Sequence, residues 1–183
     1  MKTMIFVLSL LASTSVFAKN KGIEDRIRFA ANLLAETAQG SQEYKVTPQA
    51  DTKKMLLEFA LQEGSIESEE DFEANWTTNT YELWGADGMM WGLETAGGAY
   101  GYVSNALEVA LEEGEQTDKD KITFADGMLK LNRAFQILRS IKSVKYGVAP
   151  MGAVQCGVTF PSLLIMDTEN GVIHQIIMEG SGC

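Results

Sequence analysis

Apolar residues recur every three or four positions along most of the chain, a spacing that places them on one face of an α-helix. This pattern predicts helices over about residues 23–39, 51–62, 68–76, 100–113 and 120–146. Asp51 and Ser68 stand at the starts of two of them, where their side chains can cap free N–H groups. Gly40, Gly64 and Gly114 each follow a predicted helix, as residues that end a helix often do.

The pattern changes in the last stretch, from Gly152 to Cys183, which predicts an antiparallel β-hairpin. Two β-prone runs, Thr159–Asp167 and Val172–Glu179, flank the pair Asn170-Gly171. Asn-Gly favours a two-residue type I′ turn, because both of its central residues must adopt positive φ. With that turn, the numbers of facing residues sum to 341.

Both faces of this ribbon are apolar, so it needs cover from helices or from further strands. Val154–Val158 either supplies part of a third strand or extends the first one. Residues 19–183 are therefore expected to form a single α+β domain. Four to five helices come first, and the hairpin of residues 152–183, or a three-stranded sheet, comes last.

Residues 1–18 have the features of a cleavable secretory signal. Lys2 precedes a short apolar run, and the segment ends in Val16-Phe17-Ala18. The run is too short for a membrane span, and no later run approaches the ~20 apolar residues that a span requires. We therefore expect a bacterial protein that is exported to the periplasm or secreted into the medium.

The mature chain is strongly acidic. The full sequence has 15 Lys and Arg against 25 Asp and Glu, and loss of Lys2 with the signal leaves 14 against 25, a net charge of −11. This charge disfavours nucleic acid and anionic membrane surfaces as partners. Five basic side chains gather toward the end of the last predicted helix and form either a solvated face or a docking patch for an acidic partner: Lys130, Arg133, Arg139, Lys142 and Lys145.

The two cysteines, Cys156 and Cys183, lie near the open ends of the predicted hairpin. Cys183 faces Val158 in the predicted register, one diagonal step from Cys156, so a bulge near Gly157 or Pro161 would bring the thiols together. The bridge would close a loop of about 28 residues and stabilise the fold by roughly 3 to 4 kcal/mol. An exported chain with two cysteines favours this disulfide over two free thiols.

The segment Asn75–Asn105 is the most unusual part of the sequence. It holds all three tryptophans, three of the five tyrosines and six glycines. Such side chains recur at binding surfaces, which predicts a platform for a peptide, a glycan or a protein partner. Alternatively, they form the core that joins the helices to the hairpin. The candidate binding residues are Trp76, Tyr81, Trp84, Met89, Met90, Trp91, Tyr100 and Tyr102.

Residues 115–126, between two predicted helices, resemble a calcium loop of the EF-hand type. Glu115, Thr117 and Asp126 fall at ligand positions, but the glycine that makes the sharp turn is missing. A capped turn between helices accounts for this segment better. No metal ion or other cofactor is therefore expected.

Enzymatic chemistry has few candidate residues. His174 is the only histidine, and in the predicted register it lies roughly 35 Å from Cys156 at ~3.3 Å per residue, which excludes a nucleophile pair. Asp167 faces His174 in that register, as a cross-strand pair rather than a catalytic couple. Paired carboxylates are the alternative, but with 25 acids no particular pair stands out, and no catalytic residue is predicted.

Three functions are compatible with these features. The first is a non-catalytic binding module that engages a protein or a cell-envelope ligand through the Trp76–Tyr102 region. The second is a small secreted hydrolase that uses carboxylates, which requires a concave pocket holding an Asp or Glu of raised pKa. The third is a structural envelope component, which requires stable self-association.

Overall fold

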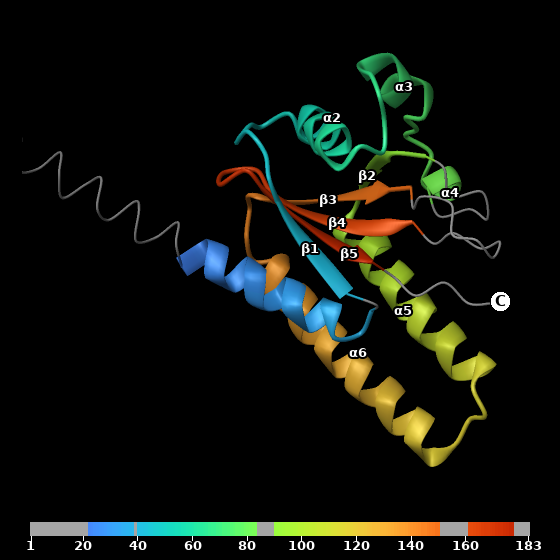
Figure 1. The fold of residues 1–183 in the computed structure, drawn as a ribbon. Coiled ribbons are helices and arrows are strands. Elements are labelled where there is room, and N and C mark those ends of the chain that lie inside the picture. The colour runs from blue at the N-terminus through green and yellow to red at the C-terminus, as the bar shows by residue number, and fades with distance from the viewer. Residues whose placement is uncertain (1–21, 39, 84–89, 151–160, 178–183) are drawn as a thin grey trace, which may run out of the picture.

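The computed structural model describes residues 22–38, 40–83, 90–150 and 161–177. A five-stranded antiparallel sheet lies at its centre, with helices on both faces (Figure 1). The order across the sheet is β1-β5-β4-β3-β2, so β4 is the middle strand and β1 and β2 are the edges. The strands are β1 (Gly40–Lys45), β2 (Gly92–Glu94), β3 (Val144–Ala149), β4 (Ser162–Asp167) and β5 (Val172–Ile177).

The helices form one layer on each face of the sheet. A helix over residues 22–35, here the N-terminal helix, packs on one face together with α5 (Ala96–Glu113) and α6 (Asp118–Leu138). The other face carries α2 (Thr52–Glu63) and α3 (Glu69–Ala74), while the short α4 (Thr80–Leu83) lies beside β2. Figure 1 shows α5 and α6 running side by side as a hairpin that extends beyond the sheet.

Two hydrophobic cores result, because alternate residues of a strand point to opposite faces. β4 serves both cores, and all six of its residues are buried, which is the near-continuous apolar run expected of a covered central strand. The larger core joins Ile27, Leu34, Val103, Leu131, Phe135 and Leu138 to Tyr146, Leu163, Ile165 and Ile176. The smaller core joins Met55, Leu56, Phe59, Phe72 and Trp91 to Leu164, Met166 and Ile173.

Side chains and glycines fix the helix ends much as their positions in the sequence predict. Asp51 accepts hydrogen bonds from the backbone N–H groups of Lys53 and Lys54 at the start of α2, and Gly64 ends that helix with a φ of 78°. Ser68 accepts from the N–H of Asp71 at the start of α3. The predicted α+β class and the capped starts of both helices are therefore confirmed.

The prediction of a sheet confined to the C-terminus is wrong, because the strands are interspersed with the helices. The sequence pattern predicts no strand between the first two helices, yet Gly40–Lys45 form β1, an edge strand whose polar side chains face solvent. The last helix ends at Leu138, before Tyr146, because residues 144–149 form the buried strand β3. Apolar and β-branched residues there satisfy either pattern, and only packing decides between them.

The hairpin of β4 and β5 exists, but its predicted register is wrong by two residues. Ile165 faces His174 and Asp167 faces Val172, so the numbers of facing residues sum to 339. The turn has four residues, since Gly171 has positive φ but Asn170 does not. The Asp167 carboxylate accepts hydrogen bonds from the Asn170 side chain and the Glu169 N–H, which keeps Asn170 out of a type I′ turn.

Several predictions concern residues outside the described ranges. The signal over residues 1–18, the strand Val154–Val158 and both cysteines, Cys156 and Cys183, lie there. The disulfide, the third strand of residues 154–158 and the export signal therefore stay predictions.

Candidate functional site

Trp91 anchors the aromatic and glycine-rich segment in the core beneath α2 and α3. The backbone N–H of Trp91 donates a hydrogen bond to the Asn75 carbonyl over 2.7 Å, and the Trp91 carbonyl accepts one from the backbone N–H of Thr77 over 2.9 Å. The indole ring packs against the rings of Phe59 and Phe72, at centroid distances of 5.9 and 5.6 Å, and is 1 % exposed. Trp91 therefore positions the residues after it and does not itself reach a ligand.

The other aromatic candidates separate between the two faces of the sheet. Trp76 is half-buried beside Phe72, with the Lys53 Nζ 4.7 Å from its ring centre. Tyr100 and Tyr102 lie on α5, where Tyr100 contacts Phe135 and the Tyr102 hydroxyl donates to the Pro161 carbonyl. Burial raises the pKa of Tyr102. The described aromatic residues therefore do not make one platform.

Four further candidates add little to these positions. Met90 is half-buried next to Trp91 in the sequence, and Tyr81 belongs to α4. Trp84 and Met89 lie outside the described residues.

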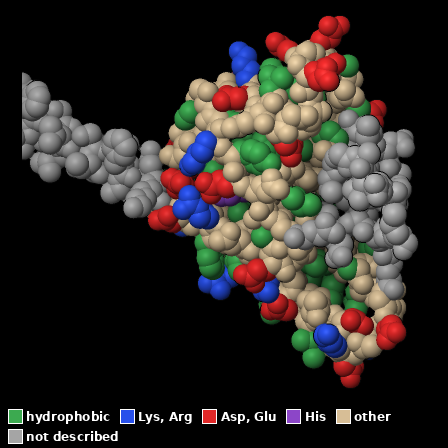
Figure 2. All heavy atoms as spheres, in the orientation of Figure 1, with side chains coloured by type: hydrophobic (Ala, Val, Ile, Leu, Met, Phe, Trp, Pro, Cys, Tyr) green, Lys and Arg blue, Asp and Glu red, His purple; other side chains and the backbone are tan. Residues whose placement is uncertain are grey.

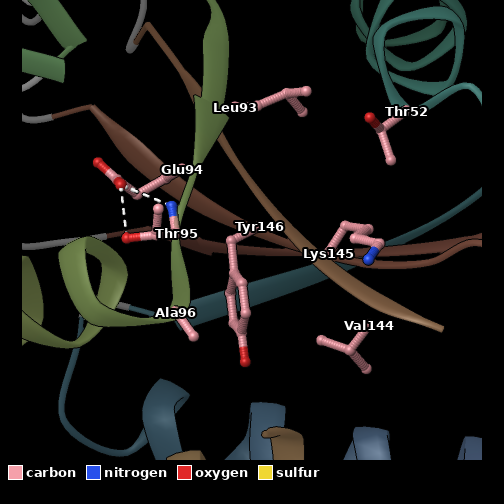
Figure 3. A pocket seen from close by; sticks show the side chains of 8 residues that line it. All are labelled: Thr52, Leu93, Glu94, Thr95, Ala96, Val144, Lys145 and Tyr146. Atoms are coloured by element: carbon pink, nitrogen blue, oxygen red, sulfur yellow. Dashed lines mark hydrogen bonds between the residues drawn. The ribbon is translucent and has the colours of Figure 1, made fainter. Parts of the chain in front are cut away.

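A cavity of about 320 Å³ opens where β2 ends and the chain turns into α5. We call it the β2–β3 notch. Figure 3 shows Leu93 and Thr52 at one end of the notch, Ala96 and Val144 at the other, and Tyr146 and Lys145 between them. Its lining consists of Thr52, Leu93, Glu94, Thr95, Ala96, Val144, Lys145 and Tyr146.

The notch exists because β2 covers only half of β3. β4 pairs with all six residues of β3, from Val144 to Ala149, whereas β2 pairs only with Tyr146, Gly147 and Val148. The chain leaves the sheet at Thr95, which caps α5 by accepting a hydrogen bond from the Gly98 N–H. Val144 and Lys145 therefore have a paired strand on one side only, within the described part of the chain.

Glu94 is occupied in closing the start of α5. Its carboxylate accepts hydrogen bonds from the N–H and the hydroxyl of Thr95, at 2.6 and 3.2 Å. A Cβ added at Gly98 would overlap this carboxylate, so the glycine makes room for it. A carboxylate at this position also complements the positive end of the helix dipole. The Glu94 carboxylate therefore has a structural role in the notch, at the start of α5.

The floor of the notch includes the ring of Tyr146, which stacks on Phe135 with centroids 5.7 Å apart. Burial raises the pKa of Tyr146 to about 12. Its buried hydroxyl has no hydrogen-bond partner among the described residues. Arg139 lies close by, with its guanidinium over the rings of Tyr100 and Phe135 and an N–H donated to the Ala96 carbonyl.

Lys145 gives the notch an exposed positive charge. Its side chain takes part in none of the ion pairs between described residues, although Lys45, Lys53 and Lys130 each pair with a carboxylate. The hydroxyl-bearing side chain of Thr52 lies at the first position of α2, on the same cavity. The arrangement offers apolar contacts, a cation and a hydroxyl, but no converging acids.

His174 lies away from the notch, on the face of β5 that the N-terminal helix covers. The imidazole is buried, and its Nδ1 is 3.8 Å from the Glu43 carboxylate. Burial lowers the pKa of His174, and its Nε2 has no partner among the described residues. The predicted Asp167–His174 pair is wrong, because the four-residue turn shifts Asp167 to face Val172.

Glu43 joins β1 to the N-terminal helix. Burial by itself raises the pKa of this carboxyl, but the hydrogen bond from Arg28 at 3.2 Å and the nearby charges of Arg28 and Lys45 together outweigh it, so the pKa of Glu43 is lowered. Arg28 also forms an ion pair with Glu24, and Lys45 forms ion pairs with Glu24 and Glu43. Figure 2 shows this mixed cluster, with the histidine just visible beneath it. A cluster of fully paired charges on a sheet edge serves to hold the helix and blunt the edge.

Of the residues considered for calcium, Glu115 and Thr117 lie between α5 and α6, whereas Asp126 lies within α6. Thr117 is the N-cap of α6 and forms a capping box with Asp120, and Asp126 pairs with Lys130 at 2.7 Å. The hydrogen bonds from Thr117 lower the pKa of Asp120. No group of three or more His, Cys, Asp or Glu that could hold a metal ion occurs within the ranges described above.

The sequence singles out the segment that builds the notch, and Lys145 as one of five clustered basic residues, but not the other residues that line the cavity. Leu93, Glu94 and Thr95 fall inside Asn75–Asn105, where the aromatic residues around them give the stronger sequence signal. The helical pattern of residues 120–146 includes Val144 and Lys145, so it does not predict their position on a strand. The sequence signal that could have indicated this site is Thr95, a typical N-cap residue, which follows Leu93 and Glu94 and predicts that a helix begins there.

No known protein family, curated protein or solved structure matches this chain. Within the described residues, none of the helices is both long and apolar enough to cross a membrane.

Proposed function

We propose that this protein is an exported bacterial binding module without catalytic activity, which engages a protein or cell-envelope ligand through the β2–β3 notch. The notch is the observation that carries the proposal. It is an open cavity built by the unusual aromatic and glycine-rich segment, and it combines apolar walls with a few placed polar groups, as small binding sites do. Trp91 and the start of α5 hold its rim in place.

The hydrolase alternative has no specific support. An acid that works in hydrolysis needs a raised pKa in a cavity. Among the described residues, the carboxyl groups with shifted pKa values are Glu43 and Asp120; both are shifted downward, and neither lines the notch. Glu94 does line the notch, but it is engaged by Thr95 at the start of α5.

The proposal is tested by titrating the mature, isotope-labelled protein with small fragments and recording amide NMR shifts. Suitable probes are N-acetyl amino-acid amides, N-acetylglucosamine and a short alkyl glycoside. We expect at least one class to shift the amides of residues 93–96 and 144–146. Leu93→Asp should abolish the shifts, because Leu93 is an exposed apolar wall of the notch.

Leu61→Asp is the matched control, since Leu61 is another exposed leucine, on α2, and does not line the notch. It should leave the shifts unchanged. Binding that survives Leu93→Asp would refute the assignment of the site. Turnover of chromogenic ester, glycoside or peptide substrates that is lost in Glu94→Gln would instead establish the hydrolase.

A further inference from the structure

We propose that two copies of this chain associate through the outer edge of β1, as an antiparallel pair of strands with Tyr44 at its centre. The two five-stranded sheets then form one continuous sheet. The proposal goes beyond the binding function above and is independent of it, because the β2–β3 notch lies toward the opposite edge of the sheet. The dimer leaves both notches open, so it presents two binding sites to a ligand.

The backbone of β1 presents unpaired hydrogen-bonding groups along this edge. The Val46 N–H donates to the Gly171 carbonyl over 2.9 Å, so the backbone groups of Val46 point toward β5. The direction alternates along an antiparallel strand, so those of Tyr44 point toward β5 as well, and those of Glu43 and Lys45 point away from it. No described strand lies outside β1 (Figure 1), and these outward groups have no partner among the described residues.

The facing side chains select one alignment of the two copies. Outward-pointing backbone groups must meet each other, so Glu43 and Lys45 of one copy pair with the same two residues of the other. With Tyr44 opposite itself, each Glu43 lies opposite a Lys45, and opposite charges face each other twice. The neighbouring alignments place Glu43 opposite Glu43 or Lys45 opposite Lys45, and like charges directly opposite each other are destabilising.

Tyr44 adds an aromatic contact at the two-fold axis. Its ring is half-buried and packs edge-on against Phe59, with centroids 4.7 Å apart. Alternation places this ring on the face of the sheet opposite to the Glu43 and Lys45 side chains. Residues that face each other in a non-hydrogen-bonded pair have Cβ atoms about 4.5–5.5 Å apart. In the dimer the two Tyr44 rings therefore lie side by side, as a stabilising aromatic pair.

The charges on β1 exclude other strands but accept a second copy of this one. Charged residues on an edge discourage strands that lack the complementary charges. Within one chain, Glu43 pairs with Arg28 and Lys45 with Glu24, and Asp25 lies 4.0 Å from Arg28. These three acids and two bases sum to −1, a small part of the −11 of the mature chain. Repulsion between the remaining charges is screened beyond ~8 Å at physiological ionic strength.

The first test uses the unchanged mature protein at increasing concentration. The contact is small, so sedimentation equilibrium should show a weak dimer with a dissociation constant of roughly 0.1–1 mM. Amide hydrogen exchange, followed by NMR, should slow with concentration at Glu43 and Lys45, whose N–H groups point outward, but not at Tyr44. A protein that stays monomeric to ~2 mM overturns the proposal. A dimer in which Glu43 and Lys45 stay unprotected also overturns it.

Charge reversal tests the alignment. Lys45→Glu places two acids opposite each other at both contacts, and Glu43→Lys places two bases there. Each variant alone should therefore associate about tenfold more weakly than the unchanged protein. An equimolar mixture of the two variants restores opposite charges at both contacts and should associate as the unchanged protein does. Circular dichroism establishes that each variant is folded, and the exchange measurement above decides the case where one is not.

Lys121→Glu is the matched control. The side chain of Lys121 is 62 % exposed, as is that of Lys45, but it lies on α6. The variant changes the net charge by the same amount and should associate as the unchanged protein does. Equal weakening by Lys121→Glu and Lys45→Glu would assign the effect to net charge and overturn the proposal. A mixture of Lys45→Glu and Glu43→Lys that does not associate would overturn it as well.

Discussion

At the scale of single residues, two tyrosine hydroxyls of this protein are in opposite situations. The Tyr102 hydroxyl donates to the Pro161 carbonyl over 3.3 Å, while the buried Tyr146 hydroxyl has no partner among the described residues. A buried hydroxyl without a partner costs roughly 1–3 kcal/mol, whereas a satisfied one contributes about 0.5–1.5 kcal/mol. The same substitution should therefore have effects of opposite sign at the two positions.

We predict that Tyr146→Phe raises the free energy of unfolding by up to ~1 kcal/mol, because it removes an unpaired polar group and keeps the ring that stacks on Phe135. Tyr102→Phe should lower it by about 0.5–1.5 kcal/mol. Urea unfolding of both variants measures the difference. A loss of stability in Tyr146→Phe equal to that in Tyr102→Phe would mean that the Tyr146 hydroxyl has a partner.

At the scale of elements, β2 depends on close backbone contact more than on its side chains. A Cβ added at Gly92 would lie 2.5 Å from the Leu83 Cδ2 and 2.7 Å from the Thr77 carbonyl oxygen. The Thr77 backbone is itself held by its hydrogen bond to Trp91, so it cannot move aside easily. The glycine thus lets β2, α4 and the Trp76–Trp91 bridge pack together.

We predict that Gly92→Ala destabilises the protein by about 1–3 kcal/mol through this overlap. Gly101→Ala is the matched control, because nothing lies within 4 Å of its added Cβ and alanine favours the helix α5. It should raise stability by roughly 0.5–1 kcal/mol. The melting temperatures of the two variants should move in opposite directions, and a neutral Gly92→Ala would show that the rim of the notch is loose.

The elements also show where the sequence was sufficient and where it was not. The caps at Asp51 and Ser68 are local, so they could be predicted from neighbouring residues alone. β1 could not, because its polar side chains are set by its place at an edge, which depends on β5 at the other end of the chain. The register of β4 and β5 failed for a similar reason, since the Asp167 carboxylate overrides the usual preference of Asn-Gly.

The notch could not be predicted from the sequence, because it depends on the relative lengths of β2 and β3, which lie far apart in the chain. Its rim lies in Asn75–Asn105, which its composition singled out, but its floor is β3, some 50 residues later. Only the pairing of Glu94 with Tyr146 shows that Val144 and Lys145 extend past the end of β2.

At the scale of the whole molecule, global stability should depend on pH through its one histidine. Burial lowers the pKa of His174 below the ordinary 6.5, the nearby cations Arg28 and Lys45 lower it further, and the acids Glu43 and Asp167 offset only part of this effect. The unfolded chain therefore binds a proton first as the pH falls. Stability is full above about pH 6.5 and declines below it, until the folded protein also takes the proton.

We predict that the free energy of unfolding falls between pH 7 and pH 5, by about 1.4 kcal/mol for each unit by which the pKa of His174 is lowered. Glu43 contributes only at lower pH, because its pKa is lowered from 4.5. In His174→Gln the same interval should show a flatter dependence, whatever the overall stability of the variant. Urea titrations at several pH values measure this slope, and an unchanged slope would assign the effect to another group.

The fully buried middle of the sheet has a consequence for the order in which the protein can fold. β3, β4 and β5 span residues 144–177, whereas the helices that cover them come from residues 22–138. A chain that emerges from its N-terminus therefore completes both helical layers before the surface on which they pack exists. Until β3, β4 and β5 have been synthesised, the apolar faces of these helices stay exposed to solvent. The incomplete chain is therefore expected to be prone to aggregation with other copies of itself.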